Sequence, residues 1–136
     1  MPERVVFACV HSAGRSQMAA GWFRALADPS MATAEAAGTQ PGPQLHPNVV
    51  EVMREAGVDL SGRKPRLLDD VLAEQKPAML ITMGCGEQCP FVPGVARDDW
   101  PLPDPKGATL EQTRKIRDDI RSRVEALLDA RGWRRK

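Results

Sequence analysis

The sequence has few aromatic residues, few cysteines and no long apolar run. Its 136 residues include no tyrosine, three phenylalanines and three tryptophans. Few aromatic side chains are therefore available to pack against the ring of an aromatic substrate, although Trp22 and Trp100 could do so. No apolar run is long enough to span a membrane. Residues 1–4 lead directly into a strand and lack the apolar stretch of a signal peptide. We therefore expect a cytoplasmic protein without membrane association.

Positive and negative charges are nearly balanced. The formal net charge is +1, which argues against a strongly basic surface for nucleic acid, and we interpret the basic stretch 131–136 as a solvated tail. A chain of 136 residues can bury one core, so we expect a single domain over residues 1–136, acting as a monomer. Three cysteines in a reducing compartment indicate thiol chemistry or metal binding rather than structural disulfides.

Strand-type and helical segments alternate along the chain. The sequence predicts strands at 4–8, 31–37, 78–82 and 98–100, and helices at 17–26, 47–57, 67–73 and 110–130. This alternation predicts an α/β fold whose parallel sheet is covered by helices on both sides and binds ligands at the carboxyl ends of its strands. Cys9 and the loop after Thr82 both lie at such ends, so we expect them to meet over one site.

The stretch from Cys9 to Ser16, Cys-Val-His-Ser-Ala-Gly-Arg-Ser, joins the first strand to the first helix. Backbone N–H groups at a helix start point inward and carry partial positive charge. Arg15 adds a planar fork that can hold two oxygens of a tetrahedral oxyanion, and the same positive field favours the Cys9 thiolate. We predict an oxyanion site with a nucleophilic Cys9. The alternative is a buried structural cysteine beside a solvated arginine.

A second cluster contains Cys85 and Cys89, which three residues separate. Helical positions four apart place Cβ atoms about 5–6 Å from each other, whereas a disulfide needs about 3.8 Å. The pair can therefore close only in a non-helical or deformable loop, which the neighbouring glycines and proline allow. One interpretation is a thiol relay in which Cys85 or Cys89 attacks the sulfur of Cys9. Inert cysteines, or half of a zinc site that lacks a second close pair of ligands, are the alternatives.

Asp104 precedes Pro105 in a loop bracketed by further prolines and a glycine. Proline stiffness would hold its carboxyl group over the site, where a general acid could protonate a leaving oxygen; the alternative is that Asp-Pro simply begins a turn. We expect the His11 side chain to point away from the anion loop. We place His46 near a helix N-terminus and assign it no catalytic role.

These motifs resemble those of the arsenate reductases built on the low-molecular-weight protein tyrosine phosphatase fold. The resemblance covers nearly the whole chain, on Cys9-x5-Arg15-Ser16-Gln17-Met18-Ala19, Ala37-Gly38-Thr39, His46-Pro47, Gly57-Val58-Asp59-Leu60-Ser61, Thr82-Met83-Gly84-Cys85, Cys89-Pro90 and Trp100-x3-Asp104-Pro105. It implies a three-layer fold with a four-stranded parallel sheet and helices on both faces. Ser16-Gln17-Met18-Ala19 and the cysteine cluster favour the reductases over the phosphatases.

The resemblance implies a role for each candidate residue. Cys9 would form a covalent adduct with arsenate, Ser16 would donate to its thiolate, and Asp104 would protonate the departing oxygen. Arsenate would be held by the side chain of Arg15 and by the backbone of the loop, namely Val10, His11, Ser12, Ala13, Gly14 and Arg15.

The resemblance also implies an external reductant, in one of two branches. In the thioredoxin-linked branch, Cys85 would attack Cys9 and release arsenite, Cys89 would then attack Cys85, and thioredoxin would reduce the outer disulfide. In the other branch, a small thiol such as mycothiol attacks the adduct and a glutaredoxin-like partner completes the cycle. In either branch we expect no bound cofactor.

The chain departs from the family pattern at three places. Ser12 stands where the family usually has an asparagine whose side chain props the anion loop, and the cysteine loop is shorter than in the well-known thioredoxin-linked enzymes. Ala20 stands where potassium-binding members carry glutamate, so we expect no metal.

Two other functions stay open. One is a phosphomonoesterase of the same fold, and weak phosphatase activity could also accompany reduction. The other is a non-enzymatic protein that binds arsenite through Cys9, Cys85 and Cys89.

Overall fold

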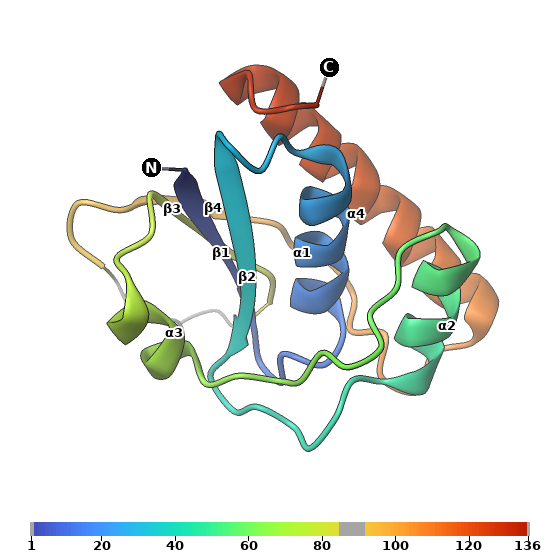
Figure 1. Ribbon diagram of the computed structural model, residues 1–136. Helices are drawn as coiled ribbons and strands as arrows, with labels where there is room; N and C mark the ends of the chain where they lie inside the picture. Colours follow the sequence, from blue (N-terminus) through green and yellow to red (C-terminus); the bar gives the residue numbers. More distant parts are fainter. Residues whose placement is uncertain (1, 85–91, 136) are drawn as a thin grey trace.

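The computed structural model describes residues 2–84 and 92–135. Within these residues, four parallel strands form one sheet in the order β2-β1-β3-β4 (Figure 1). The strands are β1 (Glu3–Cys9), β2 (Ala32–Gly38), β3 (Met79–Thr82) and β4 (Ala96–Asp99). The helices are α1 (Arg15–Leu26), α2 (Pro47–Glu55), α3 (Leu68–Glu74) and α4 (Leu110–Arg131). None of the helices described is both long and apolar enough to cross a membrane.

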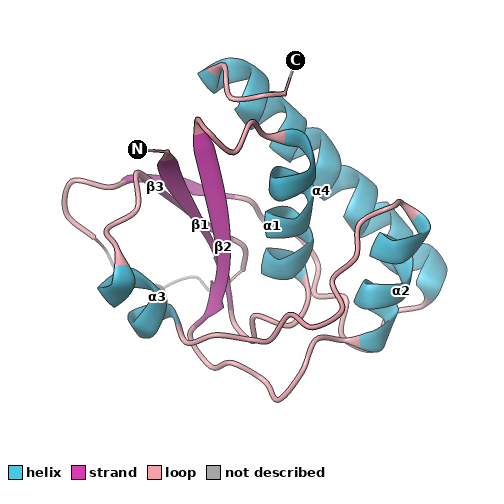
Figure 2. Ribbon diagram, viewed as in Figure 1, coloured by secondary structure: helices cyan, strands magenta, loops and turns pink. Residues whose placement is uncertain are grey.

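Helices cover both faces of the sheet, as predicted (Figures 1 and 2). On one face, α1, α2 and α4 bury the larger core, in which Phe7 of β1 belongs to the same cluster as Ile120 of α4. On the other face, α3 covers a smaller cluster that joins Val6 of β1 to Leu68. Successive residues of a strand point to opposite faces, so the continuous apolar run of β1 supplies both cores, as in other covered parallel sheets.

The helix predicted at 47–57 ends at Glu55, two residues early. Gly57 has a φ of +87°, which ends the helix in the left-handed conformation that glycine adopts without strain. The Gly57 N–H donates to Arg54 O at 3.0 Å and the Val58 N–H donates to Met53 O at 2.9 Å. These two hydrogen bonds are those of a Schellman motif, so the prediction that Gly57 stops the helix is confirmed.

The strand predicted at 98–100 begins two residues earlier and ends one residue earlier than expected. It is the edge strand β4, and all four of its residues are exposed, so no alternation of apolar and polar residues marks it in the sequence. Trp100 follows the strand, and its backbone N–H donates to Thr82 O at 2.8 Å.

The strand order places Cys9 in the crevice where parallel sheets bind ligands. The chain leaves β1 for β2 on one side, and β3 pairs with β1 on the other. The carboxyl ends of β1 and β3 therefore meet at the topological switch point of the sheet. Cys9 ends β1 and Thr82 ends β3, whereas both chain termini lie at the opposite end of the molecule (Figure 1).

Candidate active site

The loop between β1 and α1 turns its carbonyl groups outward. Each of five consecutive carbonyl oxygens accepts a hydrogen bond from a neighbouring segment: Cys9 O from Thr39 N (3.2 Å), Val10 O from Gln40 N (2.8 Å), His11 O from Gly42 N (2.9 Å), Ser12 O from Gln17 Nε2 (2.9 Å) and Ala13 O from His46 N (2.9 Å). No group in the described part of the chain accepts a hydrogen bond from the N–H groups of residues 11–15. Successive N–H donors of this kind form a nest, which binds anions.

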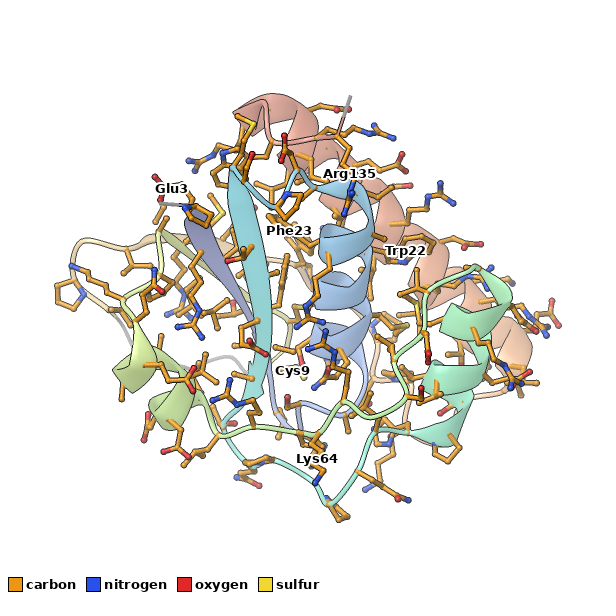
Figure 3. The ribbon with its side chains drawn as sticks, viewed as in Figure 1. Glu3, Cys9, Trp22, Phe23, Lys64 and Arg135 are labelled. Atoms are coloured by element: carbon orange, nitrogen blue, oxygen red, sulfur yellow. The ribbon has the colours of Figure 1, made fainter. Side chains whose placement is uncertain are left out.

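Cys9 lies beside this nest, against the first turn of α1 (Figure 3). Its Sγ is 3.0 Å from the hydroxyl oxygen of Ser16, and both side chains are buried. Gly14 is the N-cap of α1 and makes no side-chain cap, and the first turn holds no acidic residue. The field of the helix N-terminus is therefore not neutralised by α1 itself, and it favours negative charge at the sulfur and at a bound anion.

Arg15 is buried, which contradicts the alternative in which its side chain is solvated. Only 7% of its surface is exposed, and its Nη1 donates to Leu102 O at 3.1 Å. Gly84, just after β3, makes room for the guanidinium: a Cβ there would lie 2.2 Å from Arg15 Nη1. Gly84 also has a φ of +90°, which disfavours other residues. The guanidinium group of Arg15 is therefore held between the loop that begins after β3, at Gly84, and the segment that contains Leu102.

Asp104 lies at the rim of the site and is exposed. Its Oδ2 is 3.8 Å from Arg15 Nη2, and its Oδ1 accepts a hydrogen bond from Lys106 N at 3.0 Å. The next residue, Pro105, packs against the anion loop so closely that a Cβ on Gly14 would lie 2.7 Å from its Cγ. The carboxyl group of Asp104 therefore lies near Arg15, at the edge of the anion loop.

Asn48, in the first turn of α2, ties the segment after Asp104 to α4. Its Nδ2 donates to Pro105 O at 2.9 Å and to Thr113 Oγ1 at 3.0 Å. A longer bond from the same Nδ2 reaches Ala108 O at 3.4 Å. Asn48 thereby fixes the backbone that carries the carboxyl group of Asp104.

His46 is the N-cap residue of α2, at the helix N-terminus where it was predicted. Its ring lies 3.2 Å from the position of a Cβ on Gly14, so it packs where the anion loop meets the Asp104 segment. Burial lowers the pKa of His46 below its ordinary value, and the negative charge of Asp104 opposes that lowering. The positive groups that add to the lowering are His11, Lys106 and Arg15.

The structure brings Cys9, Arg15, Ser16 and Asp104 into one site with the loop of residues 10–15. Cys85 and Cys89 lie outside the described residues. Among the residues described, no group of three or more histidines, cysteines and acidic side chains could hold a metal ion.

Sequence reasoning gave no site role to three residues: Gln17, Asn48 and Gly84. Gly84 carried a usable signal, because this glycine lies two residues after the buried strand β3, at the ligand-binding edge of the sheet. The partners of Asn48 lie 57 and 65 residues away in sequence, so nothing local revealed its role.

Comparison with known proteins identifies the family of this chain. The family described as low molecular weight phosphotyrosine protein phosphatase matches residues 4–134. The chain belongs to this family. The resemblance drawn from the motifs is therefore confirmed, and so is the fold class that it implied.

Relatives within the family carry the names of arsenate reductases. A Halobacterium salinarum protein provisionally named an arsenate reductase is 41% identical over 129 residues, covering 90% of this chain and 89% of its own. A glutaredoxin arsenate reductase of Synechocystis is 31% identical and covers 93% of this chain and 96% of its own. The structure of a thioredoxin-dependent arsenate reductase of Corynebacterium glutamicum is 35% identical, with a TM-score of 0.79, and the match covers 95% of this chain but 61% of that one.

Proposed function

We propose that this protein is an arsenate reductase that acts through a covalent adduct at Cys9. The observation that carries the proposal is the nest of N–H donors at residues 11–15, beside a buried cysteine and a buried arginine. This donor set suits a tetrahedral oxyanion. The names of the relatives favour arsenate among such oxyanions, and Cys85 and Cys89 supply further thiols that a phosphatase does not need.

The first step would transfer arsenate to the enzyme. The Cys9 thiolate, next to the Ser16 hydroxyl at 3.0 Å, attacks arsenic, so that an S–As bond forms and an As–O bond breaks. Asp104 donates the proton that lets the departing oxygen leave as water. Arg15 and the loop N–H groups hold the remaining oxygens throughout, because they are already fixed by the surrounding chain.

The second step would reduce the arsenic. A second thiolate attacks the sulfur of Cys9, an S–S bond forms, and the electron pair of the S–As bond passes to arsenic, which leaves as arsenite. Arsenic is thereby reduced from As(V) to As(III), and two thiols are oxidised to a disulfide. No bound cofactor takes part, and the requirement for reduced thiols fits a cytoplasmic location.

The attacking thiol has two candidate sources. In the relay, Cys85 attacks Cys9, Cys89 then attacks Cys85, and thioredoxin reduces the Cys85–Cys89 disulfide. In the other route, a small thiol such as mycothiol attacks the adduct, and a glutaredoxin-type partner reduces the mixed disulfide at Cys9. Relatives of both kinds are named, one after thioredoxin and one after glutaredoxin.

Arsenate-dependent oxidation of NADPH tests the proposal and separates the two routes. The pure protein is assayed with thioredoxin and its reductase, and in parallel with a small thiol, a glutaredoxin-type protein and their reductase. Turnover in the first assay supports the relay, and turnover only in the second supports the small-thiol route. Absence of turnover in both contradicts arsenate reduction.

Cysteine variants test the roles within either route. Cys9→Ser should reduce turnover by about 10³-fold or more, because the hydroxyl is a far poorer nucleophile than the thiolate. A strict relay should also lose turnover in Cys85→Ser and in Cys89→Ser, whereas the small-thiol route tolerates at least one of them. Retained turnover in Cys9→Ser is incompatible with the proposed adduct.

A phosphomonoesterase is the second candidate, and the family match favours it. Cys9, Arg15 and Asp104 are sufficient for phosphoryl transfer through a cysteinyl phosphate, and phosphate and arsenate share shape and charge. Hydrolysis of p-nitrophenyl phosphate measures this activity directly. Efficient hydrolysis without arsenate turnover would make the phosphatase the principal function.

A further inference from the structure

Ser12, in the middle of the anion loop, has an unfavourable backbone conformation. Its φ is +54°, the one positive value among the non-glycine residues described, and its side chain is fully buried. The left-handed region is disfavoured for residues with a Cβ, so surrounding contacts must hold Ser12 there. The N–H groups of Ser12 and Ala13 belong to the nest, and their directions depend on this conformation.

Gln17, in the first turn of α1, supplies the main side-chain contact to Ser12. Its Nε2 donates to Ser12 O at 2.9 Å and lies 3.3 Å from both Ser12 Oγ and Lys64 O. Only 2% of Gln17 is exposed, so these oxygens replace water for its amide. Figure 3 shows Lys64 on the segment that runs below Cys9 in this view.

The segment that contains Lys64 and Arg66 also contacts Ser12, from the side opposite Gln17. The Arg66 N–H donates to Ser12 Oγ at 3.4 Å, and Arg66 O accepts a hydrogen bond from Gly38 N at 2.9 Å. Gly38, at the end of β2, lies so close that a Cβ there would be 2.7 Å from Ser12 N. Backbone therefore confines Ser12 on this side, and Gln17 is the side chain that fixes its carbonyl group.

We propose that Gln17 is a positioning residue for oxyanion binding: its side-chain amide holds Ser12 in the left-handed conformation and so aims the loop N–H groups at the anion. If Ser12 relaxed toward the extended region, the peptide planes on both sides of it would rotate. Donors would then leave the nest, and a carbonyl oxygen would turn toward the anion. The proposal rests on the same anion loop as the proposed function but does not require arsenate turnover.

Gln17→Met tests the proposal, because methionine keeps nearly the same volume in the buried position and removes both the donor and the acceptor. The affinity for inorganic phosphate is measured by the protection it gives Cys9 against iodoacetamide, with the Cys9 peptide quantified by mass spectrometry. We expect the dissociation constant for phosphate to rise about tenfold or more, as for the loss of a buried hydrogen bond. Gln17→Glu, which keeps the shape but faces Ser12 O and Lys64 O with an acceptor, should show a larger rise.

Gln75→Met is the matched control, since it makes the same substitution at an exposed position at the end of α3. It should leave phosphate affinity within about twofold of the wild type. Circular dichroism and thermal melts identify any variant that does not fold, and the near-isosteric Gln17→Glu and Gln17→Met changes provide two independent chances of a folded protein. Unchanged phosphate affinity in both folded variants would overturn the proposal.

Ser12→Gly tests whether Gln17 acts through the conformation of Ser12. Glycine adopts a positive φ without strain, so in this background the rise caused by Gln17→Met should shrink to about threefold or less. An equal rise in both backgrounds contradicts the proposed coupling. If the wild type itself shows no phosphate protection, the anion site is wrong and the proposed function fails with it; protection without arsenate turnover removes only the reductase activity.

Discussion

The anion loop and the Asp104 segment lie side by side over the same crevice but are built differently. Loop residues Ser12, Ala13 and Arg15 are buried, and every carbonyl oxygen from Cys9 to Ala13 accepts a hydrogen bond. The side chain of Asp104 is 41% exposed and its carboxyl group is 3.8 Å from the nearest Arg15 nitrogen. A binding loop benefits from fixed donors that need no reorganisation, whereas a group that gives up a proton in every cycle must exchange with water.

This comparison predicts that the two regions control different kinetic constants. Changes in the anion loop and its supports should mainly raise KM for arsenate, because they weaken a contact made before and during the reaction. Changes at the Asp104 segment should mainly lower kcat.

Asp104→Asn should give the largest effect and the clearest separation. Loss of a general acid costs about 10²–10⁴-fold in rate, so kcat for arsenate should fall in that range while KM stays within about threefold. Steady-state kinetics with the active reductant system measure both constants. Asp118→Asn, an exposed carboxylate on α4, is the control; a kcat for Asp104→Asn that stays near the control value would show that the proton comes from elsewhere.

Gly84→Ala should produce the opposite pattern. The added Cβ would lie 2.2 Å from Arg15 Nη1, so the guanidinium must move away from the anion, and KM for arsenate should rise about 10–100-fold with a smaller change in kcat.

Gly57→Ala is a closely matched control for Gly84→Ala. Gly57 has nearly the same backbone angle, with a φ of +87° against +90°, and nothing lies within 4 Å of a Cβ there. Both changes should cost about 1 kcal/mol of stability through backbone strain, and only Gly84→Ala should affect KM. Equal kinetics in the two variants would refute the steric role of Gly84.

Within the anion site, local features and contacts between separate loops differ in how far the sequence predicts them. Cys9, Arg15 and Ser16 lie within eight residues and between a strand and a helix, so local sequence contains most of the anion site. The close approach of Gly84 to Arg15, and the contact of Gln17 with Lys64, depend on how separate loops fold onto each other. The sequence can mark Gly84 as a glycine at the ligand-binding edge of the sheet, but it does not show which residues these contacts join. The edge strand β4 was misplaced for a related reason, because its exposed residues leave no apolar pattern.

Asn48→Ala should give a milder form of the Asp104 effect. The amide of Asn48 donates to Pro105 O and Thr113 Oγ1, so its loss frees the segment that carries the acid. We expect kcat to fall about tenfold and stability to fall by about 1–2 kcal/mol. A double-mutant cycle provides the check: in the Asp104→Asn background, Asn48→Ala should add little to the loss of kcat. Additive losses would mean that Asn48 acts on catalysis by another route.

A change at His46 should give the smallest effect, on the pH dependence of stability. Its side chain lies where the anion loop meets the Asp104 segment. Because burial lowers the pKa of His46 in the folded protein, the unfolded chain binds more protons between that lowered value and the ordinary one. Stability therefore increases with pH in this window: the contribution is complete above the ordinary pKa and is lost as the pH falls through the folded value. Nearby charges from both regions act on the imidazole, with Asp104 raising its pKa and Arg15 lowering it.

His46→Gln removes this titration while keeping a polar side chain at the N-cap of α2. Urea denaturation of the wild type should show a lower midpoint at about pH 5.5 than at about pH 7.5, and the variant should show a smaller decrease. The two proteins differ only at this side chain, so the difference between the two decreases measures the contribution of His46. Equal decreases would mean that His46 is as well solvated in the folded protein as in the unfolded chain, and that the anion loop and the Asp104 segment do not enclose it.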